Sequence, residues 1–441
     1  MRNFLGILLS FIAVSFFFFP VGFTFFPVTN TKNMLAVLGV ILLLLSFVQK
    51  REFVLPKDII ILLVLSTFVM VITIFSVTVN HTPEKSYTVY LLTALLWLLG
   101  AYAICFIIRS THGKIDFPLI LNYLCAVCVF QCVIAFLIHN IPAVQAVVDS
   151  IFSQGQEFFH EQDRLYGIGA SLDIAGTRFS CVLCSIAVLL YVKRNELSRM
   201  TVFLYIACFI IITVGGNFIA RTTTVGVGMG LAFLGVMILK DLLSGEMEER
   251  GNLIWMWILA IVIIVPAGII LYNNSEEMRS LLRFGFEGFF NLAETGEFRT
   301  QSSDHLLNKM VVFPEDLRTY ILGDGYFENS RNDINYLGDS TTQGFYMGTD
   351  IGYLRFIFLF GVPGLIAISL VMIHAALTAA RAFPKYKWAF YLALICGFVI
   401  WFKVATDVFP FLALGISAGL VKDLIDNDEI EEEEEPDSEP A

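Results

Sequence analysis

The chain has 441 residues, of which 57% are hydrophobic and 15% are charged, with a formal net charge of -11 at pH 7. A soluble domain needs about 25% charged residues to cover its surface, so the composition excludes a soluble protein. The net charge says nothing about substrate, because 11 acidic residues gather in 423–441 and the rest of the chain carries 28 acidic and 28 basic residues. Such a tail is typical of a disordered, solvated terminus.

Apolar runs predict about a dozen membrane-spanning helices, because each run approaches the roughly 20 residues that cross a bilayer. In chain order the predicted spans are residues 4–26, 33–48, 58–79, 88–108, 117–138, 171–192, 200–217, 221–239, 253–272, 350–377, 387–403 and 407–421. The first run is long, broken by Pro20 and without a clear small-residue cleavage site, so it does not indicate a cleaved signal peptide. We therefore expect an all-α polytopic integral membrane protein.

Lysine and arginine collect in alternate loops, which predicts cytoplasmic termini. The basic loops contain Lys50, Arg51, Lys57, Arg109, Lys114, Lys193, Arg194, Arg199, Lys240, Arg250, Arg381, Lys385 and Lys387. Two long segments, 139–170 and 273–349, then fall on the extracytoplasmic side. The predicted organisation is nine spans in 1–272, an extracytoplasmic loop domain in 273–349, three spans in 350–421 and the acidic tail in 422–441. The first long segment contains an amphipathic stretch at 144–152.

The eight cysteines all fall inside apolar segments. Two pairs, Cys125/Cys128 and Cys181/Cys184, have the C-x-x-C spacing of zinc or redox sites. On a helix this spacing merely places small groups on one face, and no histidine or carboxylate cluster accompanies them. We expect no metal, cofactor or disulfide. Sequences typical of ATP-driven pumps and intramembrane metalloproteases are absent as well.

The informative charges lie near the extracytoplasmic ends of predicted spans, where the positive-inside rule does not place them. They are Arg164, Arg178, Arg221, Asp350 and Arg355. Snorkelling to the interface or an ion pair, such as Asp350 with a nearby arginine, explains any one of them. Several arginines converging from different helices favour a site for phosphate oxygens, which guanidinium groups bind in bidentate fashion.

The long loop 273–349 adds further charges, most of which we interpret as surface residues. Arg299 is a candidate substrate contact, and His305 is a candidate base because it is the only histidine of the loop. The turn Leu322-Gly323-Asp324-Gly325-Tyr326 is too short for a nucleotide-binding fingerprint and lacks its flanking strand and helix.

The order of these motifs resembles the O-antigen polymerase and ligase superfamily, the Wzy and WaaL type of membrane glycosyltransferase with a GT-C-like fold. The matching stretches are Arg164-Leu165-Tyr166-Gly167, Arg221-Thr222-Thr223, Leu322–Tyr326, Thr349-Asp350-Ile351-Gly352-Tyr353-Leu354 and Gly361-Val362-Pro363-Gly364. The Asp-x-Gly-Tyr element at Asp350 is similar to that of polymerases, whereas ligases tend to have His-Asn there. The paired Arg-x10-Gly repeats of some polymerases are absent.

The resemblance implies an inverting, metal-independent transfer at the extracytoplasmic face of the bacterial inner membrane. Donor and acceptor would be oligosaccharide repeat units on undecaprenyl pyrophosphate. The implied partner protein would be a chain-length regulator, and no nucleic acid would be involved. The implied pyrophosphate ligands are Arg164, Arg178 and Arg221. Further implied substrate contacts are Arg299, Tyr353 and Arg355, and Asp350 or His305 would deprotonate the acceptor hydroxyl.

Two other functions remain open on the sequence. An O-antigen ligase-type transferase differs from a polymerase here only by the Asp350 element. A lipid-linked-sugar flippase or other transporter usually has internal repeats and a site near the bilayer midplane. We find no repeat, and the unusual charges lie near one face, so a polymerase is the favoured interpretation.

Overall fold

The computed structural model describes residues 2–49, 55–161, 164–244, 266, 268–328 and 345–434. The long helices are α1 (Arg2–Phe18), α2 (Thr31–Gln49), α3 (Lys57–Val79), α4 (Tyr90–His112), α5 (Phe117–Asn140), α8 (Leu172–Val192), α9 (Arg199–Ile219), α10 (Thr223–Leu243), α16 (Gly352–Ala382), α17 (Lys387–Ile400) and α18 (Phe409–Glu434). Short helices are α6 (Pro142–Ile151), α7 (Gln156–Glu161), α12 (Glu276–Gly285), α13 (Glu287–Thr295), α14 (Gln301–His305), the π-helical η1 (Leu306–Met310), α15 (Leu317–Leu322) and the 3₁₀ turns η2 (Tyr346–Gly348) and η3 (Pro384–Tyr386).

The chain is a helical membrane protein. Within the described ranges, seven helices are long and apolar enough to cross a membrane: α3, α4, α5, α8, α9, α10 and α16. Shorter apolar stretches occur at Phe4–Phe18, Thr31–Ser46 and Phe409–Lys422. The predicted span 253–272 lies largely outside the described residues, and only its last turn is seen as helix.

The first predicted span, 4–26, is too long, because α1 ends at Phe18. Pro20 and Gly22 follow, and the chain turns into strands β1 (Gly22–Phe23) and β2 (Phe26–Asn30). Both belong to a small antiparallel sheet with order β2-β1-β3, in which β3 is Phe152–Ser153. A proline has no N–H for the helical ladder, which explains the early end. At the other terminus, α18 continues as helix to Glu434, into the acidic segment for which the sequence predicts disorder.

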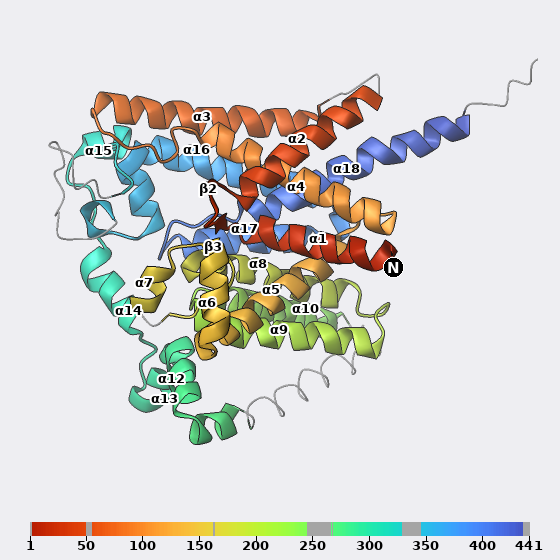
Figure 1. The fold of residues 1–441 in the computed structure, drawn as a ribbon. Coiled ribbons are helices and arrows are strands. Elements are labelled where there is room, and N and C mark those ends of the chain that lie inside the picture. Colours follow the sequence, from red (N-terminus) through yellow and green to blue (C-terminus); the bar gives the residue numbers. More distant parts are fainter. Residues whose placement is uncertain are drawn as a thin grey trace, which may run out of the picture.

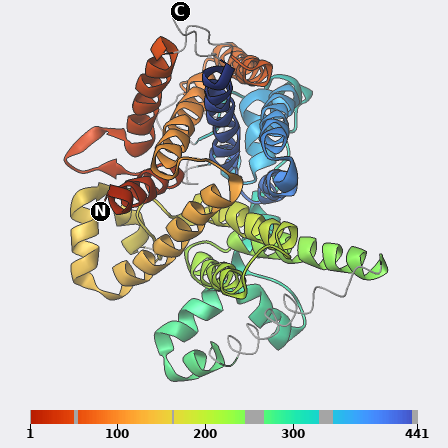
Figure 2. The ribbon, with the colours of Figure 1, turned by 90° about the vertical axis from the view of Figure 1, so that its right-hand side faces the viewer.

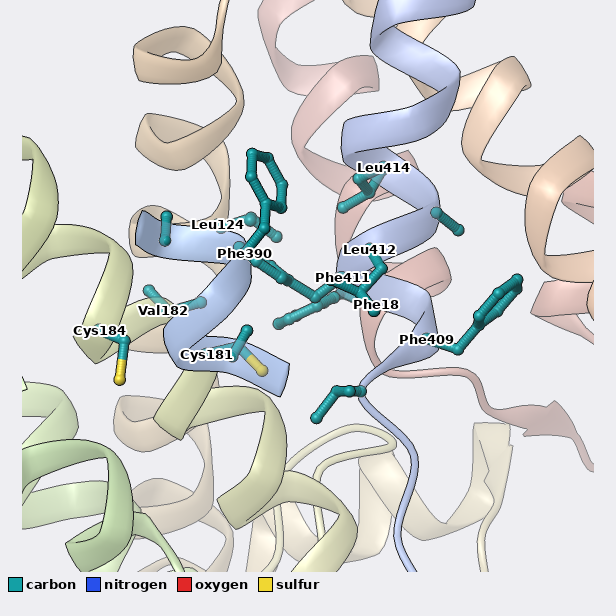
Figure 3. Close-up of a cluster of buried hydrophobic side chains, with 14 of the residues drawn as sticks. Phe18, Leu124, Cys181, Val182, Cys184, Phe390, Phe409, Phe411, Leu412 and Leu414 are labelled. Carbon is teal, nitrogen blue, oxygen red and sulfur yellow. The ribbon is translucent and has the colours of Figure 1, made fainter. Parts of the chain in front are cut away.

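Helix α8 is the centre of the bundle. In its apolar window 89% of the residues are buried, against 28% in the window of α10. Around it, Phe18 of α1, Leu124 of α5, Phe390 of α17 and Phe411 of α18 form one core (Figure 3). The eight cysteines all lie in helices as free thiols, and all but the half-buried Cys208 are buried. Cys181 and Cys184 belong to this core, as expected for small apolar groups on a helix face.

Most of the short helices gather at one end of the bundle, which we call the loop end. Figure 1 shows α7, α14 and α15 there, whereas the start of α1 and the end of α18 lie at the opposite end. In the view along the bundle, α12 and α13 lie at its lower edge, and α12 packs against α9 (Figure 2). The predicted amphipathic stretch forms α6, whose Val148 packs against Phe159 and Tyr166.

Helix α16 is broken near the loop end, at Phe360 and Gly361. Pro363 lacks an N–H, so the carbonyl of Leu359 four residues earlier is left without its helical donor. That carbonyl instead accepts the hydroxyl of Ser76 on α3 at 2.7 Å. The break therefore exposes backbone acceptors inside a packed region.

The Gly-rich turn 322–326 docks onto this break. Asp324 and Gly325 donate their N–H groups to the carbonyl of Phe358 at 2.6 and 3.2 Å. Gly323 (φ 75°, ψ 173°) and Gly361 (φ 71°, ψ -177°) both adopt a backbone conformation that is essentially restricted to glycine. A Cβ on Gly323 would lie 2.6 Å from the Leu359 carbonyl, so the two backbones meet directly. The motif fixes the end of the long loop to α16.

Candidate functional site

Arg164 is presented at the loop end by a rigid turn. Leu165 and Tyr166 are buried behind it, and Gly167 closes the turn with an N–H bond to the Ala170 carbonyl at 2.7 Å. The buried Gln131 amide of α5 holds the same turn through Ile168. It accepts the Ile168 N–H at 2.8 Å and donates to the Ile168 carbonyl at 2.9 Å. The Arg-Leu-x-Gly motif is therefore a frame that directs one arginine outward.

Arg221 follows α9 and precedes α10, and close packing of α10 on α8 holds it in place. A Cβ on Gly226 would lie 2.2 Å from the Cα of Ser180, so only glycine permits this approach. The Ser180 hydroxyl donates to the Thr222 carbonyl and accepts the Gly226 N–H, both at 3.1 Å. The small residues that follow Arg221 thus position it at the end of the most buried helix.

The two arginines converge on one aromatic ring. Phe284 of α12 lies under the guanidinium of Arg221 at 4.4 Å and under that of Arg164 at 5.8 Å. Arg221 also forms an ion pair with Glu287 of α13. Burial lowers the pKa of Arg221, which Glu287 opposes and the positive charge of Arg164 reinforces. Arg164 and Arg221 thus place two positive charges at the Phe284 ring, and Glu287 supplies one negative charge. The remaining positive charge can attract an anionic ligand.

Arg221 lines a pocket of about 350 Å³ between α13–α14 and the ends of α10 and α17. Its lining consists mostly of apolar and small polar residues: Thr222, Thr224, Val225, Gly285, Phe286, Glu287, Gly288, Phe289, Phe298, Thr300, Ser302, Ser303, Leu306, Leu307, Val399, Ile400, Phe402 and Lys403. Lys403 is a second cation here, and its Nζ lies 2.7 Å from Oδ1 of Asp173 at the start of α8. The pocket combines an apolar wall with two positive groups.

Lys403, Glu287 and Phe284 are site residues that the sequence analysis missed. Lys403 carried a usable signal, because it ends the predicted span 387–403 on the side where basic residues are unexpected. Glu287 and Phe284 carried none, since their positions depend on the fold of the long loop.

Asp350 and Arg355 form an ion pair at the start of α16, with Oδ1 and Nη1 3.4 Å apart. Burial raises the pKa of Asp350 to about 7, although Arg355 and Lys403 act against this shift. The negative charge of Asp173 raises the pKa of Asp350 further. Asp350 therefore interacts electrostatically with Lys403 of the pocket and with its partner Asp173. A carboxylate that titrates near neutral pH is suited to accept a proton.

Arg355 itself is closed in by protein groups. Its side chain is 7% exposed, its Nη2 donates to the Phe327 carbonyl at 3.1 Å, and its guanidinium lies 3.8 Å from the Phe327 ring and 4.9 Å from the Phe345 ring. Arg355 therefore joins α16 to both ends of the segment 327–345. Its contacts are those of a structural arginine.

Arg178 has a different environment from Arg164 and Arg221. It is buried on α8, with its guanidinium over the rings of Phe19 (5.6 Å) and Trp97 (5.8 Å). Lys32 lies over the same Trp97 ring at 5.0 Å, and the charge of the buried Asp407 acts on both cations. The Nε of Arg178 has no hydrogen-bond partner in the described part of the chain. Arg178 therefore contacts Phe19 and Trp97 inside the bundle and is not part of the arginine pair at Phe284.

The remaining predicted residues lie outside the pocket. Arg299 is exposed and forms ion pairs with Glu297 (3.0 Å) and Asp304 (3.1 Å) of its own loop. His305 ends α14 with an exposed side chain. Tyr353 donates its hydroxyl to the Phe398 carbonyl at 2.9 Å and packs on Trp401, which joins α16 to α17.

No group of three or more metal-ligating side chains comes together in the part of the chain that the structure describes. At the loop end the structure brings together two arginines and a lysine around an apolar pocket, with a carboxyl of raised pKa nearby. Such a set can hold an anionic group that is attached to an apolar chain, and can accept a proton beside it. Comparisons of the chain with protein-family models, curated proteins and solved structures give no match.

Proposed function

We propose that this chain is a membrane glycosyltransferase that polymerises lipid-linked oligosaccharide repeat units into a surface polysaccharide. In this proposal it spans the bacterial inner membrane about a dozen times with both termini in the cytoplasm, and the loop end is extracytoplasmic, as the distribution of basic residues predicts. Donor and acceptor are repeat units on undecaprenyl pyrophosphate.

The pocket that contains Arg221 and Lys403 carries the proposal. A polyprenyl pyrophosphate has a strongly anionic head on an apolar chain, and this pocket offers two cations within a largely apolar lining. Arg164 adds a third positive charge across the Phe284 ring. Guanidinium groups bind phosphate oxygens in bidentate fashion, and a partly water-excluded site strengthens each contact.

The reaction follows from this placement. An acceptor hydroxyl oxygen attacks the anomeric carbon of the donor, the bond from that carbon to the pyrophosphate oxygen breaks, and the hydroxyl proton passes to Asp350. The electron pair of the broken bond stays on the pyrophosphate oxygen, so the leaving group gains one negative charge. The protein has to hold the two reactants in line and stabilise this developing charge. Arg221, Lys403 and Arg164 perform the second task.

Deletion of the gene, followed by electrophoresis of surface polysaccharide, tests the proposal. A polymerase predicts loss of the long-chain ladder while a single-repeat band remains. Complete loss of capped core would indicate a ligase-type transferase instead. An unchanged ladder would contradict both functions.

A further inference from the structure

A second pocket lies on the other side of the Arg164–Phe284–Arg221 stack. It has a volume of about 360 Å³ and is lined by Ile138, His139, Gln145, Phe159, His160, Arg164, Leu165 and Tyr166. Arg164 lines this pocket, whereas Arg221 lines the apolar one, and the two guanidinium groups share the Phe284 ring. The two cavities are therefore neighbours across one arginine pair.

The second pocket contains a continuous polar network. Nε2 of His160 lies 2.8 Å from the Gln145 amide nitrogen, 2.9 Å from the Tyr166 hydroxyl and 3.1 Å from an Asp149 oxygen. Tyr166 donates its hydroxyl to Asp149 at 3.0 Å. The pocket lining presents amide, imidazole and phenol groups together, beside the stacked rings of Phe159 and Tyr166 at 5.0 Å, and Asp149 supports them from outside the lining.

The contrast between the linings identifies the ligand. A prenyl chain has no hydrogen-bonding groups, so it would displace water from these polar groups without offering them a partner, at a cost in free energy. A sugar offers hydroxyls that both donate and accept, and it has an apolar face suited to an aromatic wall. Mixed donors and acceptors with few net charges match such a polyhydroxylated ligand.

We infer that this second pocket binds the glycan of the acceptor substrate, with His160 and Gln145 contacting its hydroxyls. The inference rests on the proposed function and assigns its two substrates to two cavities. The donor pyrophosphate occupies the pocket of Arg221 and Lys403, and the acceptor sugar approaches the anomeric carbon from the side of Arg164.

Binding of two separate probes to the purified full-length protein in detergent tests this assignment. One probe is the repeat oligosaccharide, released by mild acid from the lipid-linked single-repeat material of cells that lack the gene. The other is undecaprenyl pyrophosphate without sugar. His160→Gln and Gln145→Ala should weaken oligosaccharide binding by about tenfold, as expected for loss of one hydrogen-bond partner. Both variants should leave binding of the lipid pyrophosphate unchanged.

Arg221→Ala should give the opposite result, with weak lipid pyrophosphate binding and intact oligosaccharide binding. His81→Asn is the matched control, because His81 is an exposed histidine of the connection between α3 and α4, away from both pockets. If His160→Gln and Gln145→Ala bind the oligosaccharide like wild type, the acceptor assignment is wrong and the proposed function stands. If the wild-type protein binds neither probe and extends no lipid-linked repeat, the proposed function itself fails.

Discussion

Arg221 and Arg355 lie at the same end of the bundle, yet their surroundings differ. Arg355 has a carboxylate at 3.4 Å, a backbone carbonyl at 3.1 Å and two aromatic rings around a side chain that is 7% exposed. Arg221 has one carboxylate partner and lines a cavity of about 350 Å³. An arginine at this end of the bundle thus indicates either a ligand or a structural clamp, and the free space beside it separates the two.

The largest effect is expected on stability, at the clamp. Arg355→Leu removes one partner of a buried ion pair and leaves Asp350 and the Phe327 carbonyl without their donor. Loss of one partner of such a pair costs about 3–5 kcal/mol. We expect a lower unfolding temperature in detergent and less protein in the membrane. A normally stable Arg355→Leu protein that fails only in catalysis would place Arg355 with Arg221 instead.

The pocket arginine should show the reverse behaviour. Arg221→Ala is expected to lower the rate of repeat-unit transfer by about 10²–10³-fold, as for loss of one positioned donor to a developing negative charge. Membrane accumulation should remain normal. Arg279→Ala is the control, because Arg279 is an exposed arginine of α12 that bonds to the Tyr272 carbonyl and does not line the pocket. Normal chain lengths in cells that carry Arg221→Ala would remove this residue from the site.

The docking of the long loop on α16 can be tested with a pair of glycine substitutions. Gly361→Ala forces a side chain into a conformation that costs about 1–3 kcal/mol and places Cβ 2.6 Å from the Ile321 carbonyl. Gly235→Ala in α10 meets nothing within 4 Å, so it should be neutral or slightly stabilising. Thermal unfolding compares the two proteins. Equal stability would mean that the loop is not fixed to the break in α16.

The last prediction concerns the pH dependence at Asp350. Burial raises its pKa from 3.8 to about 7, so between these values the folded protein binds a proton that the unfolded chain releases. The free energy of unfolding should therefore fall as pH rises from about 4 to 7, by about 1 kcal/mol per pH unit, and level off above. Transfer activity should rise over the same range, because the proposed base must be ionised. Asp350→Asn should remove the stability slope, which unfolding curves from pH 4.5 to 8 would detect.

The sequence predicts the bundle well where long apolar runs determine the structure. The spans 58–79 and 117–138 correspond closely to α3 (Lys57–Val79) and α5 (Phe117–Asn140). The predicted helix 4–26 was too long because hydropathy takes no account of backbone hydrogen bonding. After Pro20 the apolar residues form the hairpin of β1 and β2 instead of a helix.

The site was predictable only in part, for a physical reason. Charges at the ends of spans identify Arg164 and Arg221, because a misplaced guanidinium must find a partner. The position of a residue along a predicted helix does not tell which neighbouring helices its side chain faces. The sequence therefore could not predict that Arg178 lies beside Trp97 and Asp407. Phe284 and Glu287 come from a loop whose fold depends on long-range contacts, and no local pattern reveals them.

The cysteines described at the outset bear on how this molecule can be studied. All eight lie within helices, seven of them buried, and neither pocket has a cysteine in its lining. A thiol introduced at Ser302 or His139 would report from one pocket or the other, with little reaction of the buried native thiols. Maleimide alkylation with and without each probe would then map occupancy of the two cavities in intact cells, with the native thiols left in place.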